Sequence, residues 1–333
     1  MLQISLDDTR VRVSGLARLE RDGDGWWTPW RLPEEVLDYV GNNEFARAPR
    51  SPTGARIALR TDASVMTFSI DCEVGDACPL DLMVDDQLVE RCPIAQCRAT
   101  FTWSLPFGEH VVELWLPQFG AMRLGQITLS DAATLSLPPA ATAQWIAHGS
   151  SITQCSEASG PSEAWPTLVS RAHDWELTNL GFGAQCHLDQ TVARYIRDHP
   201  PVDLIFVCAG INIYGQASLT ARSLPSALSG FIHTVRDGHP TTPIVLMSPI
   251  LAPEREDTPN AVGLTLRDVR DIVSDMGETL VRHNDENLTI IDGLTVFGAE
   301  DAHLLGDGLH PTTRGYRLMA ERLGPKLALA IEM

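Results

Sequence analysis

Alternating strand-like and helix-like segments in the C-terminal half constrain the fold of this chain most strongly. Short apolar runs typical of buried strands occur at 143–148, 175–180, 203–208, 243–248 and 288–293. Longer amphipathic stretches such as 162–173 and 264–283 separate them, and a closing helix is expected over 312–331. Five β–α units in succession predict a parallel sheet with helices on both faces. In such sheets, functional side chains gather at the carboxyl ends of the strands.

The N-terminal half shows a different sequence pattern, in which short runs of alternating apolar and polar residues are separated by turn residues. The clearest strand candidates lie at 10–15, 64–71, 79–86, 110–117 and 123–130. This spacing predicts a small antiparallel, jelly-roll-like β-sandwich. The Pro-containing segment 131–143 suits a linker. We therefore expect a β-sandwich accessory domain over 1–138 and a catalytic α/β domain over 139–333.

Composition excludes several classes of partner and chemistry. With 25 basic and 43 acidic residues among 333, the formal net charge is −18, which disfavours nucleic acid and anionic membranes as partners. Lys326 is the only lysine, so P-loop and Schiff-base chemistry are not expected. The N-terminus lacks the features of a secretory signal, and no apolar run approaches the roughly 18 residues of a membrane span. These observations predict a soluble, cytoplasmic protein and leave its oligomeric state open.

Seven scattered cysteines indicate free thiols in a reducing compartment rather than a disulfide framework. Four of them cluster in the sequence, namely Cys72, Cys78, Cys92 and Cys97. Their spacing lacks the C-x-x-C knuckle of structural zinc sites, so no metal is expected there. No organic cofactor is expected either.

Polar residues gather in four segments of the C-terminal half, three of them directly after predicted strands and the fourth just ahead of the closing helix. These segments are His148–Thr153, Asn179–Ala184, Gly210–Asn212 and Asp307–Pro311. A serine just beyond a buried strand and ahead of a helix can be presented on a tight turn, where backbone N–H groups stabilise nearby negative charge.

In this order, the four segments resemble the conserved blocks of the SGNH (GDSL-type) hydrolases over residues 145 to 330. The resemblance implies a flavodoxin-like α/β/α fold, with Ser151 as nucleophile, His310 as base and Asp307 as its orienting carboxylate. These residue types suit the chemistry, because a serine hydroxyl needs an imidazole to accept its proton and a carboxylate to hold that imidazole. Ser150 and Ile213 depart from the family pattern, because each stands where the family usually has an aspartate.

The resemblance also implies an oxyanion hole. Its donors would be the Ser151 and Ala184 N–H groups and the Asn212 side-chain amide. The family usually has glycine where Ala184 stands, but a main-chain donor tolerates alanine if the backbone dihedrals permit a Cβ. Gly183 is the alternative donor.

Other polar residues near the strand ends have simpler expected roles. Ser150 competes with Ser151 for the N-cap of the following helix. We expect His148 to pack at a strand end, Asp292 to cap a loop, and Cys155 and Cys186 to be small buried hydrophobes. A Cys186–His187 pair is not expected, because adjacent helical residues point apart. His303 with Asp307 and His310 could be taken as metal ligands, but serine chemistry already accounts for two of them.

The N-terminal tryptophans Trp26, Trp27 and Trp30 allow two interpretations. They can pack in a sandwich core or between domains, or they can form a wall or sugar-stacking platform beside the catalytic cleft. A β-sandwich ahead of an SGNH domain resembles certain two-domain carbohydrate esterases, which keeps the second interpretation open.

Together, these features predict a serine esterase, a carboxylic ester hydrolase that acts on short-chain acyl esters, above all acetyl esters, of a small molecule or carbohydrate. An acyltransferase that uses the same site is one alternative. A carbohydrate- or protein-binding module with an inert hydrolase domain is another.

Overall fold

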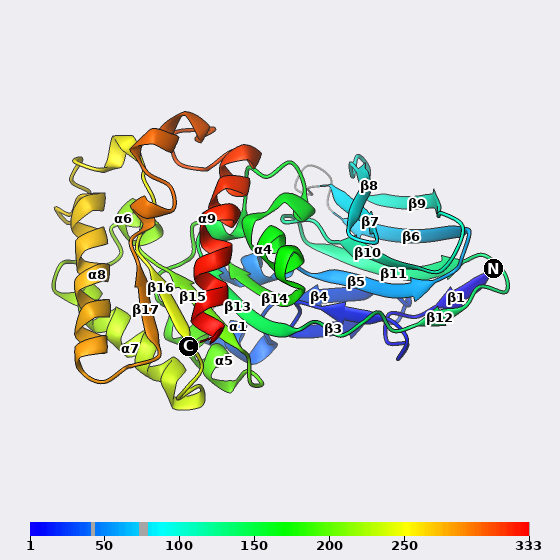
Figure 1. Ribbon diagram of the computed structural model, residues 1–333, viewed down its shortest axis with the longest axis horizontal. Helices are drawn as coiled ribbons and strands as arrows, with labels where there is room; N and C mark the ends of the chain where they lie inside the picture. The colour runs from blue at the N-terminus through cyan, green and yellow to red at the C-terminus, as the bar shows by residue number, and fades with distance from the viewer. Residues whose placement is uncertain (41–43, 73–78, 333) are drawn as a thin grey trace.

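The computed structural model describes residues 1–40, 44–72 and 79–332. Figure 1 shows a β-rich N-terminal half beside a C-terminal half of alternating strands and helices. Each half has its own cluster of buried apolar side chains. This arrangement confirms the predicted fold class, while the boundary at residues 138 and 139 stays a prediction.

Two antiparallel sheets make up the N-terminal half. Sheet A has the order β3 (Arg18–Arg21), β4 (Trp27–Trp30), β11 (Met122–Leu129), β6 (Val65–Cys72) and β9 (Arg98–Ser104), with β1 (Leu2–Ile4) beside β11. Sheet B has the order β12 (Leu135–Ser136), β5 (Arg56–Thr61), β10 (His110–Trp115), β7 (Leu80–Val84) and β8 (Gln87–Cys92), with β2 (Arg12–Ser14) beside β5.

The alternating sequence pattern explains how these sheets stack. In β6, buried residues occupy every second position, among them Met66, Phe68 and Ile70. Val112 and Leu114 of β10 belong to the same buried cluster, so the two sheets share one core. A period of two is the pattern of a strand with one face in the core.

Residues 139–332 are described without a gap and contain sheet C, a parallel sheet of five strands. Its order is β14 (Trp175–Gly181), β13 (Ala143–Gly149), β15 (Leu204–Cys208), β16 (Ile244–Met247) and β17 (Leu288–Ile291). All four residues of β16 are buried, as expected for a strand covered on both faces. Numbered along the chain, the order is 2-1-3-4-5, which is flavodoxin-like. The order reverses between β13 and β15, where an open parallel sheet binds its ligands.

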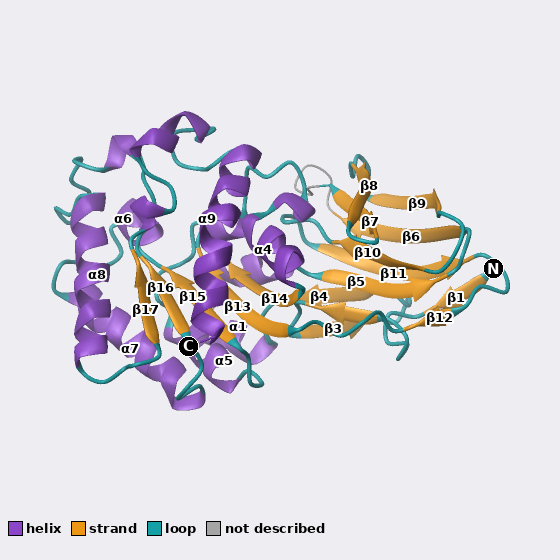
Figure 2. Cartoon of the chain, in the orientation of Figure 1, coloured by secondary structure: helices purple, strands orange, loops and turns teal. Residues whose placement is uncertain are grey.

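Helices cover both faces of sheet C, as Figure 2 shows. α4 (Trp165–His173) and α9 (Thr313–Glu332) pack together over one face, whereas α5 (Gln190–Asp198) and α7 (Ser223–Gly238) pack over the other. The remaining helices of this half are α3 (Ser151–Gln154), α6 (Ile211–Gln216) and α8 (Leu266–Arg282), with 3-10 turns η2 (Pro161–Glu163), η3 (Pro253–Arg255), η4 (Gly293–Thr295) and η5 (Ala299–Leu304). No helix in the described part of the chain is long and apolar enough to cross a bilayer.

One stretch of the N-terminal half departs from the all-β expectation. It forms α1 (Glu34–Val40), α2 (Glu44–Arg47) and the 3-10 turn η1 (Ala48–Arg50). Leu32, Val36 and Phe45 belong to the buried cluster of the C-terminal half, so this stretch packs against the α/β layer. The predicted linker 131–143 likewise contains β12, which pairs with β5. The helices α1 and α2, the turn η1 and the strand β12 are too short for sequence periodicity to predict them.

Gly181, at the end of β14, allows this strand to pack directly against α3. A Cβ placed on Gly181 would lie 2.4 Å from the Gln154 backbone N and 2.7 Å from the Thr153 carbonyl carbon. Because these neighbours are backbone atoms, they cannot move aside as a flexible side chain would.

The Gly181→Ala substitution is therefore expected to lower the free energy of unfolding by about 1–3 kcal/mol through overpacking. Thermal denaturation of the variant measures the loss. Gly23→Ala is the control, because a Cβ there has no neighbour within 4 Å. Equal melting temperatures for the two variants would contradict the tight approach at Gly181.

Candidate active site

Ser151 lies at the point where β13 leads into α3. Ser150 caps the helix, and its Oγ accepts a hydrogen bond from the Ile152 N–H at 3.2 Å. Ser150 is 3 % exposed, so of the two serines that the sequence offered for the N-cap, it is Ser150 whose hydroxyl is committed to it. Ser151 is the first residue of the helix, and the N–H groups of a first turn have no intrahelical partner.

His310 and Asp307 lie on one tight turn ahead of α9. Gly308, between them, has a φ of +77°, a conformation that favours glycine. One Asp307 oxygen, Oδ1, accepts hydrogen bonds from the N–H groups of Leu309 at 3.0 Å and His310 at 2.7 Å. This local turn explains why the aspartate precedes the histidine by three residues.

The structure brings Ser151, His310 and Asp307 into one hydrogen-bonded chain. The Ser151 Oγ lies 2.8 Å from His310 Nε2, and His310 Nδ1 lies 2.7 Å from Asp307 Oδ2. In the tautomer whose Nδ1–H donates to the carboxylate, Nε2 is the acceptor for the serine hydroxyl.

The Asp307 carboxyl is held in its charged form. Burial by itself would raise its pKa, but hydrogen bonds from the His310 N–H, the His310 ring and the Leu309 N–H outweigh burial and lower the pKa to about 2. The carboxylate therefore stays ionised at neutral pH, where it can orient an imidazole and stabilise its cation.

Asn212 lies in the first turn of α6, directly after β15. Its Oδ1 accepts a hydrogen bond from the Cys186 N–H at 3.0 Å, which leaves the Nδ2 group directed away from Cys186. The turn before it needs Gly210, because φ is +133° and a Cβ would lie 2.5 Å from Pro249 Cγ. Asn212 is thus tied to the segment that contains Ala184.

Gly183 and Ala184 lie beside Ser151, but their N–H groups differ. A Cβ on Gly183 would lie 3.6 Å from Ser151 Cβ, so this segment is next to the serine. The Gly183 N–H donates to Gln154 Oε1 at 2.7 Å and is therefore already used. The Ala184 N–H has no partner within the described ranges, and its φ of 58° lies in the left-handed region. Of the two, Ala184 has the available donor.

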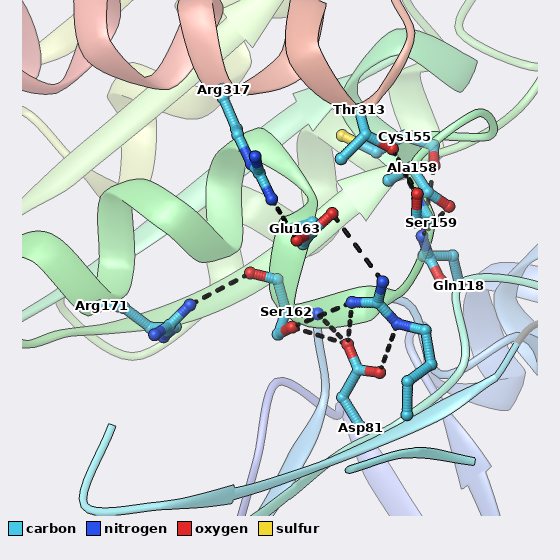
Figure 3. Close-up of polar contacts among 11 residues, drawn as sticks. Asp81, Gln118, Cys155, Ala158, Ser159, Ser162, Glu163, Arg171, Thr313 and Arg317 are labelled. Atoms are coloured by element: carbon cyan, nitrogen blue, oxygen red, sulfur yellow. Dashed lines mark hydrogen bonds and ion pairs between the residues drawn. The ribbon is translucent and has the colours of Figure 1, made fainter. Parts of the chain in front are cut away.

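The N-terminal half holds the loop that follows α3, as Figure 3 shows. The Asp81 side chain is completely buried and accepts hydrogen bonds from the Ser162 N–H at 3.0 Å and its hydroxyl at 2.6 Å. Arg91 pairs with the same carboxylate at 2.8 Å. In the same loop, the Ser159 N–H donates to Thr313 Oγ1 at 2.9 Å, at the start of α9. These contacts connect the β-rich half to the segments on either side of the site.

Arg31 supports the end of β14 from the other side. It is fully buried, and its guanidinium donates to the carbonyls of Asn179 at 3.0 Å and Gly181 at 2.7 Å. It also lies 4.6 Å from the centroid of the Phe182 ring. Burial lowers its pKa to about 9, so the guanidinium remains charged at neutral pH. Sequence reasoning missed Arg31, because no local pattern distinguishes it from a surface arginine.

His148 and Cys186 lie outside the hydrogen-bonded chain. The His148 ring stacks on Phe231 at 5.4 Å between centroids and contacts the Leu180 carbonyl through Nδ1 at 2.8 Å. Burial lowers its pKa to about 4, so the ring is neutral. Cys186 Sγ lies 3.7 Å from His148 Nε2, whereas His187 contacts Ser218. Cys186 and His187 thus have different side-chain partners, as expected, although both lie in the connection before α5 and not on a helix.

The other candidates named from the sequence, Asp292, His303 and Cys155, contact turns or the buried interior. Asp292 caps η4 by accepting from the Leu294 N–H at 3.0 Å, and His303 contacts the Glu300 carbonyl. Cys155 is buried at the end of α3, and burial raises its pKa.

The expectations for the N-terminal cysteines can be examined only in part. Cys72, Cys92 and Cys97 are free thiols, whereas Cys78 lies outside the described residues. Within residues 1–40, 44–72 and 79–332, no group of three or more His, Cys, Asp or Glu side chains is placed to hold a metal.

The three N-terminal tryptophans have different surroundings. Trp27 is buried in the sandwich core, whereas Trp26 is half-buried and lies 5.1 Å from the Arg98 guanidinium. Trp30 is half-buried beside Arg50 and lines a cavity of about 480 Å³ next to α1. Trp27 thus fits the packing interpretation, and the platform interpretation of the other two stays a prediction.

A serine, an imidazole and a carboxylate in one hydrogen-bonded chain form the arrangement that serine hydrolases use for acyl transfer. A family model of GDSL-like lipase/acylhydrolases matches residues 142–328. The chain therefore belongs to this family and is an enzyme of the carboxylic ester hydrolase class. A sequence comparison with curated proteins finds no match.

Three solved structures resemble this chain over most of its length, including both the β-rich half and the α/β half. The salicylyl-acyltransferase SsfX3 from a tetracycline biosynthetic pathway is 30 % identical, with a TM-score of 0.90, covering 100 % of this chain and 98 % of its own. A family two carbohydrate esterase from Cellvibrio japonicus is 18 % identical, with a TM-score of 0.72 and 99 % and 98 % covered. An acetyl xylan esterase, Est2A, from Butyrivibrio proteoclasticus is 14 % identical, with a TM-score of 0.59 and 84 % and 91 % covered. The two esterases share the fold.

The substitution Ala184→Gly is expected to leave ester hydrolysis within about twofold, because it preserves the main-chain N–H. It should also raise the free energy of unfolding by up to about 1 kcal/mol, since a left-handed φ strains a Cβ. Kinetics with a chromogenic ester and thermal denaturation measure the two effects.

Ala132→Gly is the matched control, because Ala132 has a φ of 60° in the β-rich half. A large loss of turnover in the Ala184 variant alone would show that the methyl group, and not only the N–H, is needed at this position.

Proposed function

We propose that this protein is a serine esterase that cleaves short-chain acyl esters through an acyl-enzyme on Ser151. The observation that carries the proposal is the hydrogen-bonded chain from the Ser151 hydroxyl through His310 to Asp307. Its location supports the proposal, because Ser151 follows β13 and Asn212 follows β15, the two strands at which the sheet order reverses.

In the first proposed step, Ser151 Oγ attacks the ester carbonyl carbon while His310 Nε2 accepts the hydroxyl proton. Asp307 stabilises the resulting imidazolium through Nδ1. The tetrahedral intermediate then collapses, the bond to the leaving alcohol breaks, and His310 returns the proton to that alcohol. In the second step, water attacks the acyl-enzyme by the same route and releases the acid. The proposed steps use no metal or organic cofactor.

We assign the oxyanion donors to the N–H groups of Ser151 and Ala184 and the Nδ2 of Asn212. The commitment of the Gly183 N–H to Gln154 supports Ala184 over Gly183. The hydrogen bond from the Cys186 N–H to Asn212 Oδ1 supports Asn212, because it fixes which end of the amide is free to donate. Removal of one such donor in other enzymes costs about 10²–10³ in turnover.

For the substrate, we propose a small-molecule or carbohydrate ester with a short acyl group, above all acetyl. The shared architecture with an acetyl xylan esterase and a family two carbohydrate esterase supports this class. The net charge of −18 disfavours strongly anionic substrates, which the surface would repel.

Acyl transfer to an alcohol is the second candidate function. The similarity to the salicylyl-acyltransferase SsfX3 over the whole chain favours it. The two functions share the acyl-enzyme and differ only in whether water or an alcohol attacks it.

Ser151→Ala is expected to abolish hydrolysis of a chromogenic acetyl ester without lowering the melting temperature, because the lost hydroxyl is the proposed nucleophile. The matched variant Ser150→Ala should lower stability by about 0.5–2 kcal/mol through loss of the N-cap and should keep turnover.

Peptide mapping after reaction with a fluorophosphonate should find the adduct on Ser151. An adduct on Ser150 would overturn the assignment, and absence of turnover by the unaltered protein would favour the binding-module alternative.

The fate of the acyl group separates the two candidate functions. When a primary alcohol is added to the reaction, hydrolysis predicts free acid as the main product, and chromatography of the products measures the ratio of acid to new ester. Predominant new ester at millimolar alcohol would establish acyl transfer instead.

A series of model esters with increasing acyl length should show the highest kcat/KM for acetyl.

A further inference from the structure

Gln154, the last residue of α3, makes two hydrogen bonds in opposite directions. Its Oε1 accepts from the Gly183 N–H at 2.7 Å, and its Nε2 donates to the Gln118 carbonyl at 2.9 Å. The side chain is only 4 % exposed, so water cannot replace either partner easily. Because one partner is a donor and the other an acceptor, the orientation of the amide group is fixed.

The first of these bonds sets the position of the segment beside Ser151. It holds the peptide unit that enters Gly183, and the next N–H along the chain is that of Ala184. Gly183 itself approaches Ser151 so closely that a Cβ there would lie 3.6 Å from the serine Cβ. Gln154 thus joins the helix that carries the serine to the segment that carries the proposed oxyanion donor.

The second bond anchors Gln154 to the β-rich half of the chain. The Gln118 carbonyl, in the connection between β10 and β11, also accepts from Thr53 Oγ1 at 2.7 Å. Thr53 and Gln118 are both fully buried. The Gln118 side chain makes separate contacts, donating to the carbonyls of Cys155 and Ala158 at 3.4 Å each. The anchor for Gln154 is therefore a main-chain oxygen held in the interior.

We propose that Gln154 is a positioning residue that sets the Ala184 N–H for the oxyanion, and that the β-rich half acts in catalysis by anchoring Gln154. This inference rests on the proposed ester cleavage at Ser151. It assigns the N-terminal half a role in transition-state stabilisation, in addition to any role in substrate binding.

Gln154→Met tests the proposal, because methionine has a similar length but cannot bond to Gly183 or Gln118. We expect kcat to fall at least about tenfold while KM changes less than about threefold, since a displaced donor acts on the transition state. Inhibition by a trifluoromethyl ketone, which forms a tetrahedral adduct with serine, should weaken by a factor similar to the loss in kcat/KM. If this variant does not fold, Gln154→Asn replaces it, because its side chain is too short to bridge both partners.

Thr61→Val is the control. Thr61 is 1 % exposed in the β-rich half, and its hydroxyl donates to the Thr134 carbonyl at 2.6 Å, so the substitution removes a buried hydrogen bond that does not involve Gln154 or Gln118. We expect lower stability with kcat within about twofold of the unaltered protein.

Equal losses of kcat in both variants, or an unchanged kcat in Gln154→Met, would overturn the positioning role. Absence of turnover by the unaltered protein would overturn the proposed function instead, and with it this inference.

Discussion

The reversal of strand order between β13 and β15 is the constraint on which the site depends. Because the connections that follow these two strands run in opposite directions, a crevice opens between them at the carboxyl edge of the sheet. Ser151 and Asn212 follow these two strands, and the turn from Asp307 to His310 reaches the same edge before α9. A serine, an amide and an imidazole far apart in the sequence can therefore be neighbours without any strand being distorted.

The second constraint comes from the β-rich half, which supports the site from buried positions. Arg31 contacts the end of β14, Asp81 contacts the loop after α3, and the Gln118 carbonyl contacts Gln154. Each contact joins a buried polar group to main-chain or side-chain groups of the other half, so leaving it unmade would cost free energy. The two halves are thus joined by polar contacts directed at the segments around Ser151.

Sequence periodicity predicted the sheet strands of the C-terminal half, the helices α4, α8 and α9, and five of the strands in the sandwich. It did not predict short elements such as α1 and α2, because four to seven residues carry too little periodic signal. Within the site, Ser151, Asp307, His310 and Asn212 were predicted with their segments. Arg31, Gln118 and Gln154 were not, since their importance comes from partners that lie 29 to 150 residues away.

By itself, the sequence determined which residue types stand at the strand ends and in what order, because strand periodicity and turn residues are local properties. Only the tertiary structure decided which N–H beside the serine is available. Gln154 occupies the Gly183 N–H, and the left-handed turn leaves the Ala184 N–H without a partner in the described ranges. That outcome depends on contacts between segments that are distant along the chain, and local sequence patterns do not predict such contacts.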